Sequence, residues 1–204
     1  RMTPQYEERM QADLDKVRRK FHTVAELVVN QVKDTIQALI GWDRDLANTV
    51  VLGDRQVNRR IKEIDHLSHA FITRHAPSAG HLRFASSILR LNVALERVGD
   101  YAKNLSELVE IQAGPLPDGE IVGELQEIRR GVEAAFRAAS KIFGASDREQ
   151  AMEMIQQGRA IAHRCDVLIS QIGRAGYGGE ATTVLVLATR FYKRIGGHVL
   201  NVLS

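Results

Sequence analysis

Apolar residues recur every three or four positions through most of the chain, which is the spacing of one face of an α-helix. Three successive stripes fill the first half: Leu14, Val17, Phe21, Val24, Val28, Val32, Ile36 and Leu39; then Val57, Ile61, Ile64, Leu67 and Phe71; then Phe84, Ile88, Leu91, Leu95, Val98, Ala102, Leu105 and Val109. Gly41 ends the first stripe, and Pro77 separates the second from the third. No alternation typical of strands competes with this pattern, so we predict an all-α fold.

A break in the pattern divides the chain into two parts. Residues 114–119 contain two prolines and two glycines, which cannot continue a helix. Three further helices are predicted at about 120–143, 147–175 and 179–204, with breaks at Gly144 and at residues 176–180. Helices of this length favour extended antiparallel packing, as in spectrin-like bundles. The sequence therefore predicts a three-helix repeat over 1–113, a linker over 114–119 and a second three-helix repeat over 120–204.

The two halves resemble each other in sequence. Residues 95–105 (LERVGDYAKNL) align with residues 192–202 (YKRIGGHVLNV), with Arg97, Gly99 and Asn104 opposite Arg194, Gly196 and Asn201. The openings of two helices, at 42–47 and 146–151, are also alike in their Asp-Arg pairs. Matches in the same order indicate a duplicated three-helix unit.

Composition narrows the classes of function. The 28 basic and 25 acidic residues are well mixed, which argues against a nucleic-acid interface. The single cysteine, Cys165, excludes an internal disulfide and a cysteine-rich zinc site, and its apolar neighbours predict a small buried side chain. No apolar run reaches about 18 residues and no signal-peptide pattern precedes the first helix, so we expect a cytoplasmic protein without a membrane span.

Two carboxylates lie one turn apart on the third helix. Glu96 and Asp100 occupy positions i and i+4, where like charges cost an isolated helix roughly 0.2–0.5 kcal/mol. With Asn92 and Asn104 they form an unbroken polar line beside the apolar stripe. Such a pair indicates a positive group between them, which is a metal ion, or else a side chain such as Lys103 or Arg97.

The second helix offers further oxygen and nitrogen ligands. Asn58, Asp65 and His69 are spaced by seven and four residues and share roughly one face, with Asp54 near it. The predicted metal ligands are therefore Glu96 and Asp100 first, joined by Asp65, Asn58 and His69. Carboxylate and amide oxygens suit Mg, Mn, Fe or Ca.

The second half departs from its own repeat at this point. The alignment places Lys193 opposite Glu96 and Gly197 opposite Asp100, so both carboxylates are lost. A lysine ammonium has no acceptor and cannot bind a metal ion. Lys193 either pairs with Asp166 or points to water. We predict that metal binds to the first half alone.

The segment 95–105 resembles the signature of the PhoU family, an Arg-Ile-Gly-Asp core inside an acidic motif. Residues 54–83 are similar to the preceding PhoU segment, except that His81 stands where the family usually has Asp before Leu-Arg, and residues 190–204 resemble a second copy of the motif. The resemblance implies two tandem three-helix bundles and a cytoplasmic, non-enzymatic negative regulator of phosphate homeostasis. It also implies a divalent or trivalent metal ion (Mg, Mn, Fe or Zn), self-association, most simply as a dimer, and two partners, the phosphate ABC transporter ATPase and a sensor histidine kinase.

Two alternatives remain at the level of sequence. A ferritin-like metal enzyme or storage protein would place Glu-x-x-His pairs on facing helices. Glu63 and His66 give one such pair, but no second pair follows in the third, fifth or sixth helix. The other alternative is the cytoplasmic tail of a phosphate transporter.

Overall fold

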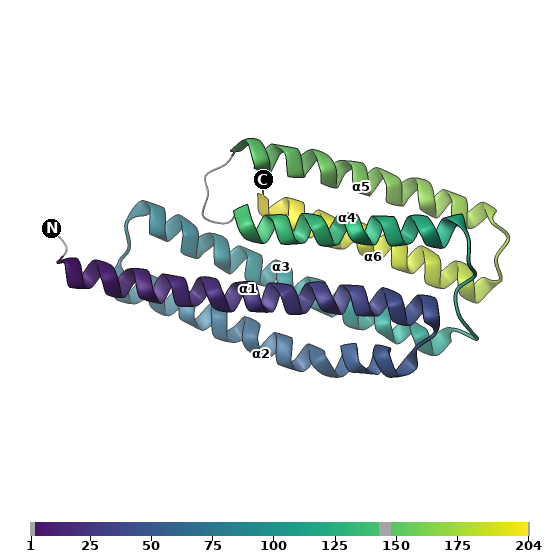
Figure 1. Ribbon diagram of the computed structural model, residues 1–204, viewed down its shortest axis with the longest axis horizontal. Coiled ribbons are helices and arrows are strands. Elements are labelled where there is room, and N and C mark those ends of the chain that lie inside the picture. Colours follow the sequence, from purple (N-terminus) through teal and green to yellow (C-terminus); the bar gives the residue numbers. More distant parts are fainter. Residues whose placement is uncertain (1–2, 143–147, 204) are drawn as a thin grey trace.

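The computed structural model describes residues 3–142 and 148–203, and in these ranges it consists of six long helices and one short 3-10 helix (Figure 1). The elements are α1 (Pro4–Gly41), α2 (Arg44–His75), α3 (Ala79–Glu107), η1 (Leu108–Ile111), α4 (Glu120–Ile142), α5 (Arg148–Arg174) and α6 (Gly179–Leu203). The all-α prediction is confirmed, and the described ranges contain no strand. The predicted break at Gly144 and the predicted helix ends at 143, 147 and 204 lie outside the described residues.

Local chemistry sets the turn between α1 and α2. The α1 helix ends at Gly41, as the sequence predicts, but the left-handed residue that follows is Trp42, with φ 55°. A non-glycine residue in this region costs roughly 1–2 kcal/mol. The Asp43 amide donates to the Ala38 carbonyl at 2.9 Å, and the Asp43 carboxylate accepts from the Leu46 amide at 2.9 Å. These contacts fix the turn and place the Trp42 ring at the end of the bundle.

The helices form two bundles that lie side by side. α1, α2 and α3 pack on one another, as do α4, α5 and α6, while α1 and α3 face α4 and α6 (Figure 1). One continuous hydrophobic core runs through both bundles and includes most of the predicted apolar stripes. The Tyr192 hydroxyl of α6 reaches across to donate to the Val32 carbonyl of α1 at 3.3 Å. The two bundles therefore do not have separate hydrophobic cores. The division into two repeats over 1–113 and 120–204 stays a prediction.

The connection between the bundles is tied to the end of α1. The Leu116 amide donates to the Ile40 carbonyl at 3.1 Å. The Gln112 side-chain amide donates to the carbonyls of Leu39 and Gly114 at 2.9 and 3.2 Å. Residues 112–116 therefore pass over the end of the first bundle in a fixed conformation.

Repeat-related residues meet where α3 packs on α6. Tyr101 and His198 occupy corresponding positions in the alignment that pairs Arg97 with Arg194. Their rings stack with centroids 5.6 Å apart, and the Tyr101 hydroxyl lies 3.1 Å from His198 Nε2. Burial and the nearby charges of Arg97 and Arg194 lower the pKa of His198. Corresponding positions of the two halves thus meet in the contact between α3 and α6.

Cys165 is fully buried and unpaired, which confirms the sequence prediction for this side chain. Burial raises the pKa of its thiol to about 11. In the described part of the chain, no helix combines the length and the apolar character needed to cross a membrane.

Candidate metal site

Glu96 and Asp100 lie on the solvent-exposed side of α3. The polar line that contains them turns inward at Asn92, which is buried and donates from its side chain to the Ile61 carbonyl of α2 at 2.6 Å. Asn92 therefore fixes the register between α2 and α3. Among the side chains that the structure describes, no basic group forms an ion pair with Glu96 or Asp100, which leaves their charges without a fixed partner in the fold.

Asp54 on α2 is the buried carboxylate nearest to this pair. Its Oδ2 accepts from the Asn58 side-chain amide at 3.0 Å, and its Oδ1 has no hydrogen-bond partner. Burial raises the pKa of Asp54, and the Asp100 carboxylate raises it further, while Lys103 and Asn58 act in the opposite direction. The Asp100 carboxylate on α3 therefore lies close enough to Asp54 for its charge to act on the buried carboxyl group.

A third helix contributes an uncommitted amide to the same region. Gln31 on α1 is only 8% exposed, and neither its Oε1 nor its Nε2 has a hydrogen-bond partner. A methyl group built at Gly99 would lie 3.6 Å from Asp54 Oδ1 and 3.7 Å from Gln31 Oε1. Gly99 thus leaves its side-chain position free beside two buried oxygens that lack donors.

The structure separates Asp65 and His69 from this group. They pair with each other on the outside of α2, where His69 Nδ1 lies 2.9 Å from the Asp65 carbonyl oxygen and 3.7 Å from its carboxylate. With Ile61 beside Asn92, the antiparallel register sets Asp65 and Glu96 about eight residues apart along the helices, or roughly 12 Å. The same register sets Glu96 at the level of Asn58 and Asp100 at the level of Asp54, to within about one residue, so these three predicted ligands stay together with Asp54.

The donor set fits a hard cation. Carboxylates of Asp54 and Asp100 repel each other, and the side-chain oxygens Asp54 Oδ1 and Asn58 Oδ1 are buried without donors. An oxygen-binding cation would relieve both costs. The described residues contain no group of three or more His, Cys, Asp or Glu side chains already arranged as a metal site. The candidate site therefore depends on amide oxygens as well as carboxylates.

Asp54 and Gln31 join the candidate site beyond the ligands predicted from the sequence. The signal for Asp54 was present, since Asp54 and Asn58 repeat on α2 the i, i+4 spacing of Glu96 and Asp100 on α3. Gln31 had no such signal, because a glutamine at the flank of a valine stripe looks like a surface residue until its neighbours are known.

In the second half, a lysine takes the place of the carboxylate pair. Lys193 Nζ lies 2.6 and 2.8 Å from the two carboxylate oxygens of Asp166. This confirms the charge pair that the repeat alignment raised as one of two possibilities. A methyl group at Gly197 would meet nothing within 4 Å, so this position offers no group to a ligand.

Comparisons with known proteins agree with the fold and the motif. The model of the PhoU domain matches residues 21–109. A curated relative from Pseudomonas putida, a phosphate-specific transport system accessory protein PhoU homolog, is 28% identical over 98% of this chain and 80% of its own length. The corresponding protein of Escherichia coli is 24% identical over 94% of this chain and 80% of its own length.

Solved structures extend the likeness to three dimensions. The crystal structure of PhoU from Pseudomonas aeruginosa has a TM-score of 0.84 and 26% identity, and covers 95% of this chain and 94% of its own. PhoU from Streptococcus pneumoniae, at 17% identity, shares the fold with the same TM-score over 95% of this chain and 93% of its own. With the domain matched in the first half and the likeness running through both bundles, the chain is similar to PhoU proteins in sequence and in fold over nearly its whole length.

Proposed function

We propose that this protein is a regulator of phosphate uptake and of phosphate-responsive gene expression that works through contacts with other proteins. The observation that carries the proposal is the likeness to phosphate-specific transport system accessory proteins over nearly the whole chain. In this role it restrains uptake when phosphate is plentiful, in the cytoplasm, without catalysing a reaction. Its partners are the ATPase of the phosphate ABC transporter and a sensor histidine kinase.

The metal ion belongs to the first bundle in this proposal. Glu96 and Asp100 of α3, with Asp54 and Asn58 of α2, hold a divalent or trivalent cation such as Mg, Mn or Fe, and Zn fits less well because the donors are oxygens. The support is the repulsion between Asp54 and Asp100 and the donor-free oxygens beside them. The ion neutralises a group of carboxylates and ties α2 to α3.

The alternatives have less support. A ferritin-like enzyme or storage protein needs a preformed set of carboxylate and histidine ligands, and the described residues show no such group. The relatives are named as accessory proteins of a transport system, which does not favour a transporter tail. Self-association as a dimer stays a prediction, and sedimentation analysis of the purified chain measures it directly.

Deletion of the gene tests the regulatory role. Expression of phosphate-uptake genes, measured in high and low phosphate, is expected to stay high in phosphate-replete cells that lack the protein. Restoring the wild-type gene should restore repression. Equal expression and equal uptake in both strains under both conditions would remove the proposal.

A double variant tests the metal site separately from the regulatory role. Glu96→Gln with Asp100→Asn keeps the side-chain shapes and removes both charges, so Mn(II) binding measured by calorimetry should be lost while helicity by circular dichroism is unchanged. Asp166→Asn is the matched control in the second half and should keep the wild-type stoichiometry. In crystals soaked with Mn(II), anomalous scattering should appear beside Asp100, and a peak beside Lys193 alone would contradict the assignment.

A further inference from the structure

Gln31 on α1 carries a buried amide to which the fold gives no hydrogen bond. Its side chain is 8% exposed, and neither Oε1 nor Nε2 has a partner. Within the ranges that the structure describes, Gln31 is the one buried side chain that leaves all of its polar atoms unpaired. A buried amide without partners lowers stability, so an atom from outside the chain is expected to serve it.

The polar side chain one turn further along α1 is satisfied. Thr35 Oγ1 donates to the Ala102 carbonyl of α3 at 3.1 Å and lies 2.9 Å from the Ser106 hydroxyl. Thr35 and Gln31 are four residues apart, so they lie on one face of α1, and this face packs on α3. The contact between α1 and α3 therefore provides partners for a buried hydroxyl group but none for the amide.

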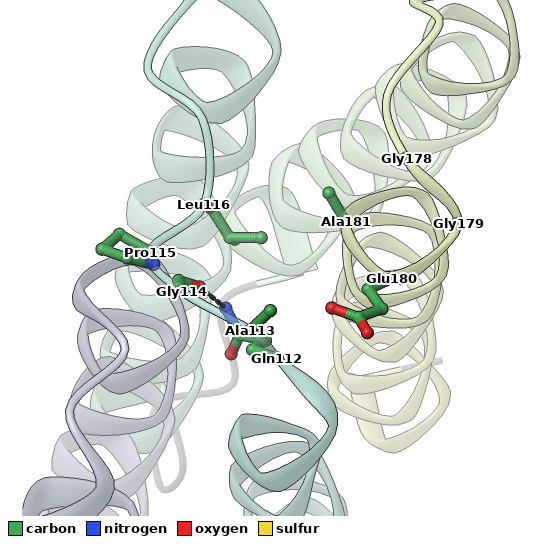
Figure 2. A pocket seen from close by; sticks show the side chains of 9 residues that line it. All are labelled: Gln112, Ala113, Gly114, Pro115, Leu116, Gly178, Gly179, Glu180 and Ala181. Atoms are coloured by element: carbon green, nitrogen blue, oxygen red, sulfur yellow. Dashed lines mark hydrogen bonds between the residues drawn. The ribbon is translucent and has the colours of Figure 1, made fainter.

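A second buried glutamine shows how the fold holds such an amide elsewhere. Gln112 Nε2 donates to the Leu39 and Gly114 carbonyls, and Figure 2 shows the bond to Gly114 beside a hollow of about 470 Å³ at the start of α6. These bonds fix which end of the Gln112 amide is the nitrogen. No bond does so for Gln31, whose amide can turn to present either its oxygen or its nitrogen.

Two glycines leave space around the Gln31 amide. A Cβ at Gly53 of α2 would lie 3.8 Å from Gln31 Nε2, and a Cβ at Gly99 of α3 would lie 3.7 Å from Gln31 Oε1. The same Cβ position at Gly99 is 3.6 Å from Asp54 Oδ1, which also lacks a donor. The Gln31 and Asp54 oxygens therefore border one space between α1, α2 and α3, which would accept a methyl group without a clash.

Two oxygens without donors beside one buried space favour a cation or a water molecule bound to it. The Asp54 carboxylate supplies negative charge, and the Gln31 amide supplies an oxygen without a charge of its own. Hard cations such as Mg²⁺, Mn²⁺ and Ca²⁺ take ligands of both kinds. An N–H group of the protein would also serve these oxygens, but the described residues place none there.

We propose that Gln31 is a metal-binding residue whose side-chain oxygen holds the ion or its bound water, so that the site spans α1 as well as α2 and α3. The ion lies on the inner side of Asp54, toward the space beside Gly99. The inference rests on the metal site of the proposed function, to which it adds a third helix and a neutral oxygen ligand.

Gln31→Met tests this role, because it removes both polar atoms and keeps an unbranched side chain of similar length. In chelator, this variant should unfold at a higher urea concentration than the wild type, since the amide that it removes makes no bond to the protein. Its affinity for Mn(II), measured by calorimetry, should fall at least about tenfold through the loss of one oxygen. A gain of stability without metal, together with a loss of affinity for metal, is the result expected of a binding residue.

One further variant and one control make the test specific. Gln31→Glu keeps a side-chain oxygen and adds a negative charge, so Mn(II) should bind at least as tightly as to the wild type. Its stability in chelator should fall, because a second carboxylate then lies beside Asp54. Gln37→Met makes the matched substitution at an exposed position of the same helix and should leave both the urea midpoint and the affinity unchanged.

Two results would overturn the proposal. A lower stability of Gln31→Met in chelator would show that the amide is bound within the protein, with Nε2 turned to donate to Asp54. An unchanged affinity of Gln31→Met for Mn(II) would show that the ion does not depend on this side chain.

The double variant of Glu96→Gln and Asp100→Asn separates this inference from the proposed function. If that variant loses Mn(II) while Gln31→Met keeps it, the metal site stands and Gln31 has no part in it. If the wild type itself binds no Mn(II), the metal site and this inference both fall. The regulatory role is tested by gene deletion and does not depend on either result.

Discussion

The two repeat-related glycines, Gly99 in α3 and Gly196 in α6, provide a matched test of the space beside the candidate metal site. Each lies inside a helix, where glycine costs about 1 kcal/mol relative to alanine. At Gly196 a new methyl group would meet only Val132 Cγ2, at 4.0 Å. At Gly99 it would meet Asp54 Oδ1 at 3.6 Å, Gln31 Oε1 at 3.7 Å and Val57 at 3.9 Å, so neither substitution causes a clash.

The expected free energies differ because the new neighbours differ. Gly196→Ala should raise the free energy of unfolding by about 1 kcal/mol through helix propensity, or about 2–4 °C in Tm for a chain of this size. Gly99→Ala gains the same propensity but closes the space beside two buried acceptors that lack donors. Because these oxygens lack a donor in the wild type as well, the cost of the methyl group is that it keeps out any water molecule or cation that could serve them, and losing such a partner costs about 1–3 kcal/mol. We therefore expect Gly99→Ala to be less stable than Gly196→Ala by at least about 1 kcal/mol.

Urea unfolding measures this difference. Circular dichroism and Trp42 fluorescence should report one transition, since both bundles share a core, and the chelated protein gives the values without metal. Added Mn(II) should then raise the midpoint of the wild type and of Gly196→Ala, because a ligand of the folded state stabilises it by mass action. The midpoint of Gly99→Ala should rise less.

Equal stabilisation by both alanines in chelator, together with an equal response to Mn(II), would refute this reasoning. Gly99 would then be an ordinary position in a helix contact, and the unpaired oxygens of Asp54 and Gln31 would have no part in binding a cation. A lower stability of Gly99→Ala in chelator with a normal response to metal would place the ion on the outer side of Asp54, away from Gln31.

Three further predictions concern other contacts. His75 Nε2 lies 2.8 Å from Asp13 Oδ2, and this hydrogen bond, together with Arg74, lowers the pKa of Asp13 below its ordinary value of 3.8. Asp13→Asn should therefore lower the free energy of unfolding by about 1–2 kcal/mol at pH 7. That cost should begin to shrink below about pH 4 and disappear as pH falls through the lowered pKa of the folded carboxyl group, and a cost that is constant in urea titrations from about pH 2 to 7 would count against the charge. The pair of Lys193 with Asp166 is partly exposed, so Lys193→Met should change stability by no more than about 0.5 kcal/mol, and a loss of several times that amount would show a structural role. Cys165 should not react with a disulfide reagent at pH 8 until the protein unfolds, because its thiol is buried and burial raises its pKa to about 11. Fast labelling of the native protein would contradict this burial.

The fold could be predicted from the sequence because its main signals are local. Helical periodicity depends on residues three and four positions apart, and the breaks at Gly41, Pro77 and residues 114–119 are marked by backbone chemistry. The left-handed conformation of Trp42 was not predictable, since glycine is the expected residue there and Trp42 is held by the contacts of its neighbours. The single core shared by both bundles could not be predicted either, because the sequence shows the apolar stripes but not how the helices that carry them are oriented relative to one another.

The candidate site was harder to predict because it depends on register between helices. Periodicity assigns Asn58, Asp65 and His69 to roughly one face of α2, but it does not say which of them lies beside Asp100. That choice follows from packing, in particular from the bond of Asn92 to the Ile61 carbonyl. The pair of Lys193 with Asp166 could be foreseen because the internal repeat supplied the register that a single helix lacks.

The contact between Tyr101 and His198 joins corresponding positions of two halves that differ in charge near this contact. Contacts between corresponding residues are typical of an isologous interface, and the packing of α3 on α6 and of α1 on α4 pairs corresponding helices in the same way. In a fully symmetric body, a metal site beside α3 would have an equal site beside α6. Lys193 occupies the equivalent of Glu96 and is already neutralised by Asp166, so the second half needs no external cation. The two halves thus correspond in their helix contacts and differ in charge at this position, which is why we predict metal binding for the first bundle alone.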